Sequence, residues 1–364
     1  MTATSEMLEI RGLARDFATA ELRPHTEKWD AERGLDPDVI AKIGELGFFG
    51  MLVPEDSGGM GFSLPAWLGA LEELAWGEPA VALLIAQSVI AADVIARFGG
   101  SDRTDLLGSL ATGEITGCIA FAEDESSADA GTADARATQH GDGWTFAGLK
   151  RWVTNGAQAE LAIVLADVAG APSLFALTRD AGYRIGSPAA TMGLRAVPLV
   201  AFDLDGVTAP LASRLAWNGT DPRAALDPLG CLSAAAIAVG IAQAALDHAV
   251  RYANEREQFG RSIRSFEGIQ FKLAEMATRT AGARALVEQA AARPDDRAAP
   301  AMAKLAAGSC AMYVTTDAVQ IFGGYGYMRD YPVEKLMRDA KAMEMLHGTS
   351  EMQRLRIAAA LYAD

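Results

Sequence analysis

Apolar residues recur at helical spacing through the first third of the chain. Three of them would share one face of the first helix, because they lie three and four positions apart: Ile10, Leu13 and Phe17. Asp36-Pro37 has the order of a helix N-cap and first turn. A more apolar helical stretch follows at residues 65–98. We therefore expect an N-terminal helical domain at residues 1–114.

Short apolar runs replace the helical spacing from about Thr116. Turn residues such as His140-Gly141-Asp142-Gly143 separate them. In chain order the runs are GCIAF, WTFAGLKRWVTNG, LAIVLADV, SLFALT and LVAFDLDG. Aromatic and β-branched residues bounded by turn signals are typical of strands. We expect a middle, antiparallel β domain at residues 115–221.

The last third is alanine-rich and helical again. Ile269, Leu273 and Met276 fall on one helix face, and residues 291–300 have the polar composition of a connection between helices. Small residues such as Gly240 would let helices approach closely. This pattern predicts a C-terminal antiparallel four-helix bundle at residues 222–364. The fold class is therefore α+β, with helical domains on both sides of a β domain.

Composition excludes several classes of function. The chain has 364 residues, of which 50% are hydrophobic, and a formal net charge of -15. That charge opposes binding to nucleic acid or anionic lipid through a basic field. No uninterrupted apolar run reaches the roughly 18 residues of a membrane span, and MTATSEMLEIRG lacks the order of a signal peptide. We expect a cytoplasmic protein without a nucleic-acid or membrane partner.

The cysteines do not indicate a disulfide framework or a metal site. Cys118, Cys231 and Cys310 are odd in number, far apart and without paired ligand spacing. We expect reduced, buried thiols and no metal.

Three segments carry candidate chemistry, although each alone has an ordinary structural interpretation. WVTNG after a strand, with FAE on a neighbouring strand, could be core packing. Arg256 in YANEREQFGRSI could complement the dipole at a helix C-terminus. The glycines of QIFGGYGYMRDYPVEKLMRDAK and LHGTSEMQRL could serve tight turns.

Together, in this order and spacing, the three segments closely resemble the acyl-CoA dehydrogenase family. The resemblance covers essentially the whole chain, and QIFGGYGY, YPVEKLMRDAK and GTSEMQR are highly specific. It implies an FAD cofactor bound between the β domain and the C-terminal helices. It also implies that a neighbouring subunit completes the site, so we expect a homo-oligomer, at least a homodimer.

The resemblance also implies roles for individual residues. Trp152 would pack against the flavin ring, and the Thr154 hydroxyl would donate to flavin N5. Arg256 would meet the FAD pyrophosphate across the dimer, a role that suits a forked, permanent cation. The other implied cofactor-binding residues are Phe121, Ala122, Ser127, Ala128, Phe259, Gln320, Gly324, Thr349 and Glu351. The implied substrate-binding residues are Ala128, Leu346 and Gly348.

The sequence departs from the family pattern at several of these places. The usual Thr-Glu-Pro and Gly-Ser-Asp are replaced by Ala122-Glu123-Asp124 and Ser127-Ala128-Asp129, a usual Gln by Glu267, and a polar Ser-Asp near the expected CoA by Val197-Pro198. The last change weakens the expectation that free CoA is the carrier.

The departure with the greatest chemical consequence lies in MLHGTSEM. His347 stands where most of the family carries the glutamate that removes the substrate's α-proton, and the alternative glutamate position, counted back from Arg256, is Gly230. An imidazole with a reference pKa near about 6.5 is largely neutral at cytosolic pH and can accept a proton. We therefore predict His347 as the catalytic base. The alternative is a histidine that only fills space. Glu344, three residues earlier, would either orient the imidazole or face solvent.

These features predict an FAD-dependent dehydrogenase of a small acyl thioester. Seven lysines against twenty-five arginines indicate a GC-rich bacterial genome. In that setting an altered base resembles enzymes of polyketide antibiotic biosynthesis that oxidise acyl groups on acyl carrier protein, such as hydroxymalonyl or methoxymalonyl extender units. The open alternatives are a short-chain acyl-CoA dehydrogenase with a histidine base, a flavin-dependent monooxygenase and a non-catalytic subunit. The electron acceptor would be electron-transfer flavoprotein or oxygen.

Overall fold

A computed structural model describes residues 3–100, 103–123, 133–217, 226 and 228–362. Its first part is helical: α1 (Ala3–Phe17), α2 (Thr26–Glu32), α3 (Pro37–Glu45), α4 (Leu64–Gly77), α5 (Pro79–Phe98) and α6 (Thr104–Thr112). Ser63 caps α4 by accepting a hydrogen bond from the Ala66 N–H, and the Glu78 carboxylate caps α5. The periodicity predicted α1, α3 and the apolar stretch at residues 65–98, but that stretch forms two helices, α4 and α5, and α2 and α6 were not predicted.

Two details differ from the expectation for this region. The α3 helix does begin at Pro37, but the Asp36 carboxylate accepts from Lys28 Nζ and Trp29 Nε1 instead of capping the helix. Phe17 is buried as expected, whereas Leu13 is 46% exposed. Periodicity identifies an apolar stripe, and the neighbouring helices decide how much of it they cover.

The middle part contains the strands β1 (Gly117–Ala120), β2 (Arg136–His140), β3 (Gly143–Ala147), β4 (Leu149–Thr154), β5 (Leu161–Val168), β6 (Ala171–Thr178), β7 (Arg184–Ile185), β8 (Leu199–Asp203) and β9 (Thr208–Pro210). One sheet has the order β1-β5-β2-β3-β9, with β6 also paired to β5, and a smaller sheet has the order β4-β8-β7. Each apolar run named from the sequence overlaps at least one of these strands, and WTFAGLKRWVTNG covers β4 and most of β3.

The larger sheet is mixed, whereas we expected an antiparallel one. Strand β5 pairs in parallel with β1 and β2, and antiparallel with β6. Parallel neighbours need a long crossover, which the three intervening strands supply between β1 and β5. The β5–β6 pair is instead joined by a two-residue turn at Ala169-Gly170, both with positive φ.

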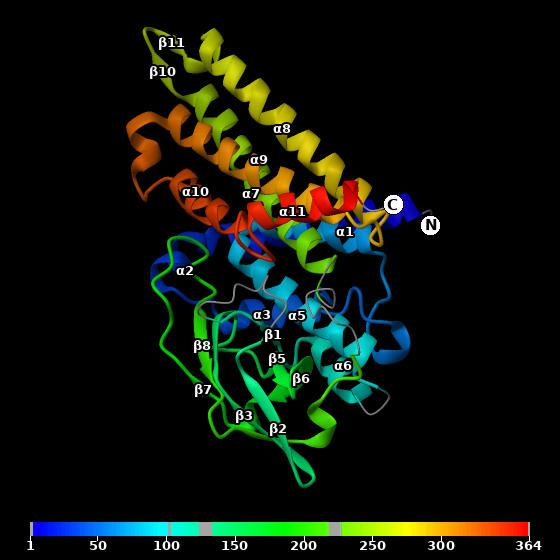
Figure 1. Ribbon diagram of the computed structural model, residues 1–364. Helices are drawn as coiled ribbons and strands as arrows, with labels where there is room; N and C mark the ends of the chain where they lie inside the picture. Colours follow the sequence, from blue (N-terminus) through cyan, green and yellow to red (C-terminus); the bar gives the residue numbers. More distant parts are fainter. Residues whose placement is uncertain (1–2, 101–102, 124–132, 218–225, 227, 363–364) are drawn as a thin grey trace.

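The last part is an assembly of helices. It comprises α7 (Leu229–Glu255), α8 (Glu267–Ala291), α9 (Ala299–Phe322), α10 (Pro332–Met343) and α11 (Ser350–Leu361), with the small hairpin β10 (Glu257–Gln258) and β11 (Arg261–Ser262) between α7 and α8. The tip of α7, the hairpin and α8 form an arm that projects away from the sheets (Figure 1). The α8–α9 connection falls where the sequence predicted it.

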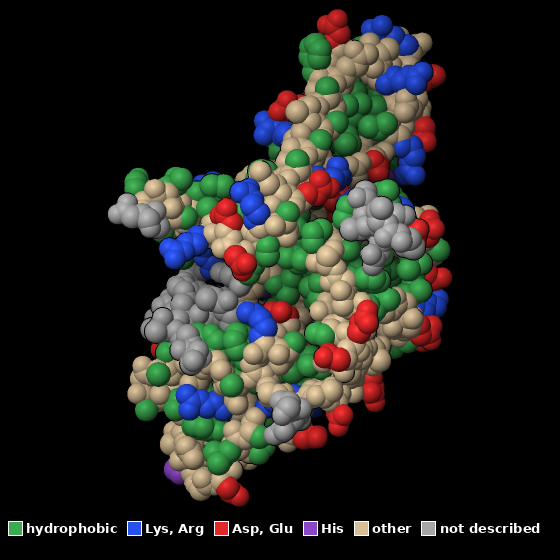
Figure 2. Space-filling model, turned by 90° about the vertical axis from the view of Figure 1, so that its right-hand side faces the viewer, with side chains coloured by type: hydrophobic (Ala, Val, Ile, Leu, Met, Phe, Trp, Pro, Cys, Tyr) green, Lys and Arg blue, Asp and Glu red, His purple; other side chains and the backbone are tan. Residues whose placement is uncertain are grey.

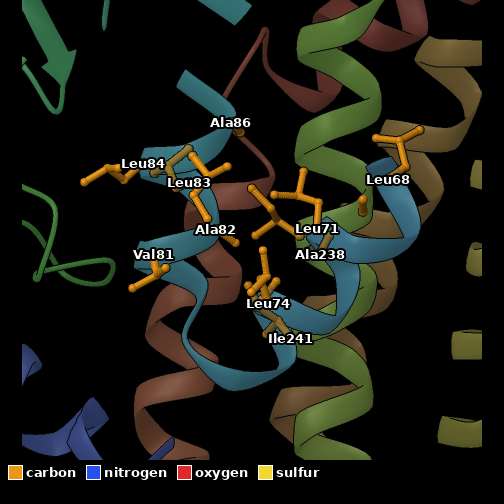
Figure 3. Close-up of a cluster of buried hydrophobic side chains, with 14 of the residues drawn as sticks. Leu68, Leu71, Leu74, Val81, Ala82, Leu83, Leu84, Ala86, Ala238 and Ile241 are labelled. Carbon is orange, nitrogen blue, oxygen red and sulfur yellow. The ribbon is translucent and has the colours of Figure 1, made fainter. Parts of the chain in front are cut away.

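The core joins the two helical parts. Leu71 and Leu74 of α4 lie beside Ala238 and Ile241 of α7, with α5 next to them (Figure 3). Gly240 makes this approach possible, because an added Cβ would lie 2.4 Å from the Glu72 carbonyl oxygen. Helices α5 and α7 are long and apolar enough to cross a bilayer, but 89% of the most apolar window of each is buried inside the protein. They are core helices here.

The arm presents apolar side chains between charged ones (Figure 2). Phe259 at the hairpin is 92% exposed, and Phe271 on α8 and Tyr327 after α9 are also exposed. The three cysteines are buried and free, as expected. The order of helices, strands and helices confirms the predicted fold class.

Candidate active site

A cavity of about 780 Å³ lies where the sheets meet α5 and the turn between α10 and α11. Its walls are mainly apolar, and the contributing side chains include Leu83, Ile119, Phe121, Leu194, Val197, Leu226 and Leu346. Ligand sites commonly combine such walls with a few placed polar groups. Here those groups include Gln87, Thr154 and His347.

An irregularity in β4 directs Trp152 toward the cavity. The pairing of β4 with β8 shifts register between Lys150 and Val153, and Trp152 has a φ of 57°. Such a bulge rotates one side chain out of the alternation of the strand. The indole is consequently 57% exposed and lines the cavity, while Val153 is buried.

Thr154 places a buried hydroxyl at the same wall. Its side chain lines the cavity and is buried. Within the described ranges the hydroxyl has no side-chain hydrogen-bond partner. A hydroxyl can donate one hydrogen bond and accept others, so this group is suited to a polar atom of a ligand.

Glu123, beside Ala122, is a structural carboxylate. It pairs with the buried Lys150 ammonium and accepts hydrogen bonds from the Asp134 N–H at 2.7 Å and the Ala135 N–H at 2.9 Å. Burial alone would raise the pKa of the Glu123 carboxyl, but these donors hold it below its usual value. The carboxylate therefore joins β4 to the segment after β1.

The backbone that carries His347 is held by two buried side chains. Lys304 Nζ of α9 donates to the carbonyl oxygens of Glu344 and Gly348, at 3.1 and 2.5 Å. Gln353 Nε2 donates to the carbonyl oxygen of His347 at 2.9 Å. His347 itself has a φ of 54°, an uncommon conformation for a residue with a side chain. The surrounding contacts therefore determine its position.

The imidazole of His347 lies between α5 and α7. Its Nε2 is 3.3 Å from Gln87 Nε2, and a Cβ added to Gly230 would lie only 2.4 Å from its Nδ1. The two positions that the family resemblance marks for a glutamate thus adjoin each other. The imidazole from one fills the space that a side chain at the other would need.

The ring is held neutral by its surroundings. Burial, reinforced by the cationic side chains of Lys304 and Arg356, lowers the pKa of His347 to about 4. The sequence-based expectation of a pKa near the ordinary value was wrong, because it omitted burial. Glu344 does not orient the imidazole, since its carboxylate pairs with Lys341 Nζ at 2.6 Å.

The structure brings together only part of the predicted site. The cavity is lined by Phe121, Ala122, Trp152, Thr154, Leu346, His347, Gly348 and Thr349. Four predicted residues lie elsewhere, at the hairpin or near the end of α9: Arg256, Phe259, Gln320 and Gly324. Glu351 is exposed and pairs with Arg354. Ser127 and Ala128 lie outside the described residues.

Sequence reasoning missed several cavity residues. Gln87 is the clearest case, and a signal for it existed, since it is a polar residue inside the apolar run AVALLIAQSVIAADV. Arg356 and the loop at residues 189–194 also line the cavity, but nothing in their local pattern distinguishes them.

The helical and β regions thus enclose one apolar cavity with an exposed indole and a neutral imidazole on its walls. Family models for the acyl-CoA dehydrogenase N-terminal, middle and C-terminal domains match residues 4–114, 118–207 and 229–362. The chain belongs to the acyl-CoA dehydrogenase family. Its enzymes are FAD-dependent oxidoreductases.

Individual relatives resemble the chain over nearly its full length. A probable acyl-CoA dehydrogenase, YngJ of Bacillus subtilis, is 38% identical over 98% of this chain and 97% of its own. Butyryl-CoA dehydrogenase from Megasphaera elsdenii superposes with a TM-score of 0.94 at 33% identity, covering 98% of both chains. The prolyl acyl carrier protein oxidase AnaB superposes with a TM-score of 0.92 at 26% identity, covering 99% of both.

The residues on the cavity wall fit the FAD cofactor of this family. The exposed Trp152 ring offers an apolar face for a planar ring system, and the Thr154 hydroxyl offers a hydrogen bond to a heteroatom. Both residues lie on β4, and they line the same cavity as His347.

Proposed function

We propose that the chain is a dehydrogenase of a small acyl thioester, with His347 as the base. The observation that carries the proposal is a neutral imidazole on the wall of an apolar cavity. The other position where the family carries its glutamate is Gly230, which adjoins the ring and has no carboxylate. A base must be unprotonated before it can accept a proton. A pKa of about 4 keeps the ring in that state at neutral pH.

The cofactor contacts follow from the same wall. Trp152 packs beside the flavin ring, and the Thr154 hydroxyl donates toward flavin N5. Phe121, Ala122 and Thr349 complete the contacts from this chain. FAD, when bound, accepts the hydride that leaves the substrate, while His347 takes the proton.

The remaining cofactor-binding residues contact the FAD that is bound by a partner subunit. Arg256 and Phe259 lie at the end of the arm, away from the sheets (Figure 1), and Gln320 and Gly324 lie near the end of α9. None of the four lines the cavity of its own chain. A homodimer in which each arm reaches the partner's FAD gives these residues a ligand, with the exposed Phe259 covered by that contact.

The acyl group is small and its carrier is an acyl carrier protein. Val197, buried on the cavity wall, offers an apolar surface where the family's polar pair would meet CoA. The likeness to AnaB supports a carrier-bound substrate, as in hydroxymalonyl or methoxymalonyl extender units. The second candidate is a short-chain acyl-CoA dehydrogenase with a histidine base, which the likeness to butyryl-CoA dehydrogenase favours.

The test is anaerobic stopped-flow reduction of the bound flavin by a panel of CoA and carrier-protein thioesters. His347→Gln should retain FAD but slow reduction at least about a hundredfold, the usual contribution of a positioned base. His140→Gln, at an exposed position on β2, is the matched control and should leave the rate unchanged.

Near-wild-type reduction in His347→Gln would exclude the base role. Bleaching by no thioester in the panel, followed by a long-lived oxygen adduct after chemical reduction, would favour a monooxygenase. Faster bleaching by butyryl-CoA than by carrier-bound acyl groups would favour the second candidate.

A further inference from the structure

Gln87 is a buried polar residue in the most apolar part of α5. Its side chain is 4% exposed, and the surrounding helix buries Leu83, Leu84 and Ile90. A buried amide is costly unless it makes hydrogen bonds. Its partner is the His347 ring, at 3.3 Å between the two Nε2 atoms and 260 residues away in the chain.

Within the part of the chain that the structure describes, this contact is the one hydrogen bond to the ring nitrogens of His347. On its other side the ring faces Gly230, which has no side chain to pair with Nδ1. Gln87 and His347 both line the cavity. The amide is therefore the group placed to decide which ring nitrogen carries the proton.

Building on the proposed role of His347 as the base, we propose that Gln87 is a positioning residue that selects the Nδ1-protonated tautomer of that ring. The Gln87 amide donates an N–H to the single lone pair of Nε2, which keeps the proton of the neutral ring on Nδ1. An amide has both donor and acceptor atoms. When Nε2 takes the substrate's proton, the amide gives up its hydrogen bond to that lone pair, and a half-turn lets the amide Oε1 accept the new N–H.

A neutral partner matters because of the charges around the ring. Lys304 of α9 and Arg356 of α11 are both cationic, and Cys231 of α7 contacts the His347 carbonyl oxygen through its thiol at 3.7 Å. A carboxylate in place of the Gln87 amide would pair with the imidazolium and favour the protonated ring. Glutamine binds the ring without stabilising its charged form in this way.

The variants separate these functions of the amide. Gln87→Met keeps the approximate volume but removes the hydrogen bond, and Gln87→Glu offers only acceptor atoms when ionised. Leu84→Met, buried on the same helix but not on the cavity wall, is the matched control. Each variant is prepared as full-length, FAD-loaded protein, and its circular dichroism and flavin spectrum establish that it is folded.

The first measurement is solid-state ¹⁵N NMR of histidine-labelled protein without substrate. The chain has four histidines, and the signals absent from His347→Gln identify the ring. We expect one tautomer, protonated at Nδ1, in wild type and Leu84→Met. Gln87→Met should show both tautomers, and Gln87→Glu should show both nitrogens protonated near pH 6.

The second measurement is the pH profile of flavin reduction. Gln87→Met should be about tenfold slower with little change in the substrate concentration needed for half-maximal rate, and Gln87→Glu should lose activity at a higher pH than wild type. A single, unchanged tautomer in Gln87→Met, or an unshifted profile in Gln87→Glu, would overturn the role of Gln87. The NMR result does not depend on catalysis. If His347→Gln is slow but the spectra of the Gln87 variants match wild type, the positioning role of Gln87 is refuted while the proposed base role of His347 stands.

Discussion

Gly230→Ala tests the position of the His347 ring with the smallest possible change. The added methyl would lie 2.4 Å from Nδ1 and 2.9 Å from Cε1. Non-bonded atoms of this kind prefer about 3.5 Å, so the ring must move by about 1 Å. A displacement of that size can cost a reaction about a hundredfold. We expect flavin reduction to slow by that order while FAD stays bound.

The same substitution has opposing effects on stability. Alanine is favoured over glycine inside a helix by about 1 kcal/mol, whereas overpacking a filled core costs about 1–3 kcal/mol. We expect the free energy of unfolding to fall by no more than about 2 kcal/mol. The reduction rate should therefore change far more than the stability.

Stopped-flow reduction and urea unfolding of the same preparations measure the two effects. Gly282→Ala on α8 is the control, because an added Cβ there meets nothing within 4 Å. It should gain about 0.5–1 kcal/mol and keep the wild-type rate. A wild-type rate in Gly230→Ala would show that the imidazole does not rest against α7 in solution.

Three further predictions concern the pH dependence of the reduction rate, the pH dependence of stability, and the arm. Because burial lowers the pKa of His347 to about 4, flavin reduction should stay flat from about pH 8 to 5.5 and fall only as pH approaches 4; an inflection near 6.5 would contradict the buried ring. His347 and His248 both have lowered pKa values, so the unfolded chain binds more protons below about pH 6.5 and stability to urea should fall with pH there. Arg256→Ala should weaken FAD retention by about 1.5–3 kcal/mol, the value of a charge-assisted hydrogen bond. Equilibrium FAD titration measures this change, Arg293→Ala in the α8–α9 connection is the control, and equal affinities would remove Arg256 from the cofactor site.

Local sequence was sufficient for the order of elements. Apolar spacing and turn residues identified the helices around the β region, and the specific C-terminal motifs indicated the family. The parallel pairing of β1 with β5 could not be read in this way, since alternation along a strand does not name its neighbour. The outward position of Trp152 also depends on a register shift between β4 and β8, which involves two strands.

For the candidate site, the sequence by itself determined that a histidine replaces the expected glutamate and that the alternative position is glycine. Only the tertiary structure decided that these two positions adjoin, that Gln87 meets the ring, and that burial lowers the pKa of His347. The physical reason is that helical periodicity specifies which face of a helix is buried, but not which distant residue it meets. Helix α5 packs on α7, α7 on α9, and α9 on α11. This packing brings α5 to the turn before α11, and no local pattern in the sequence records it.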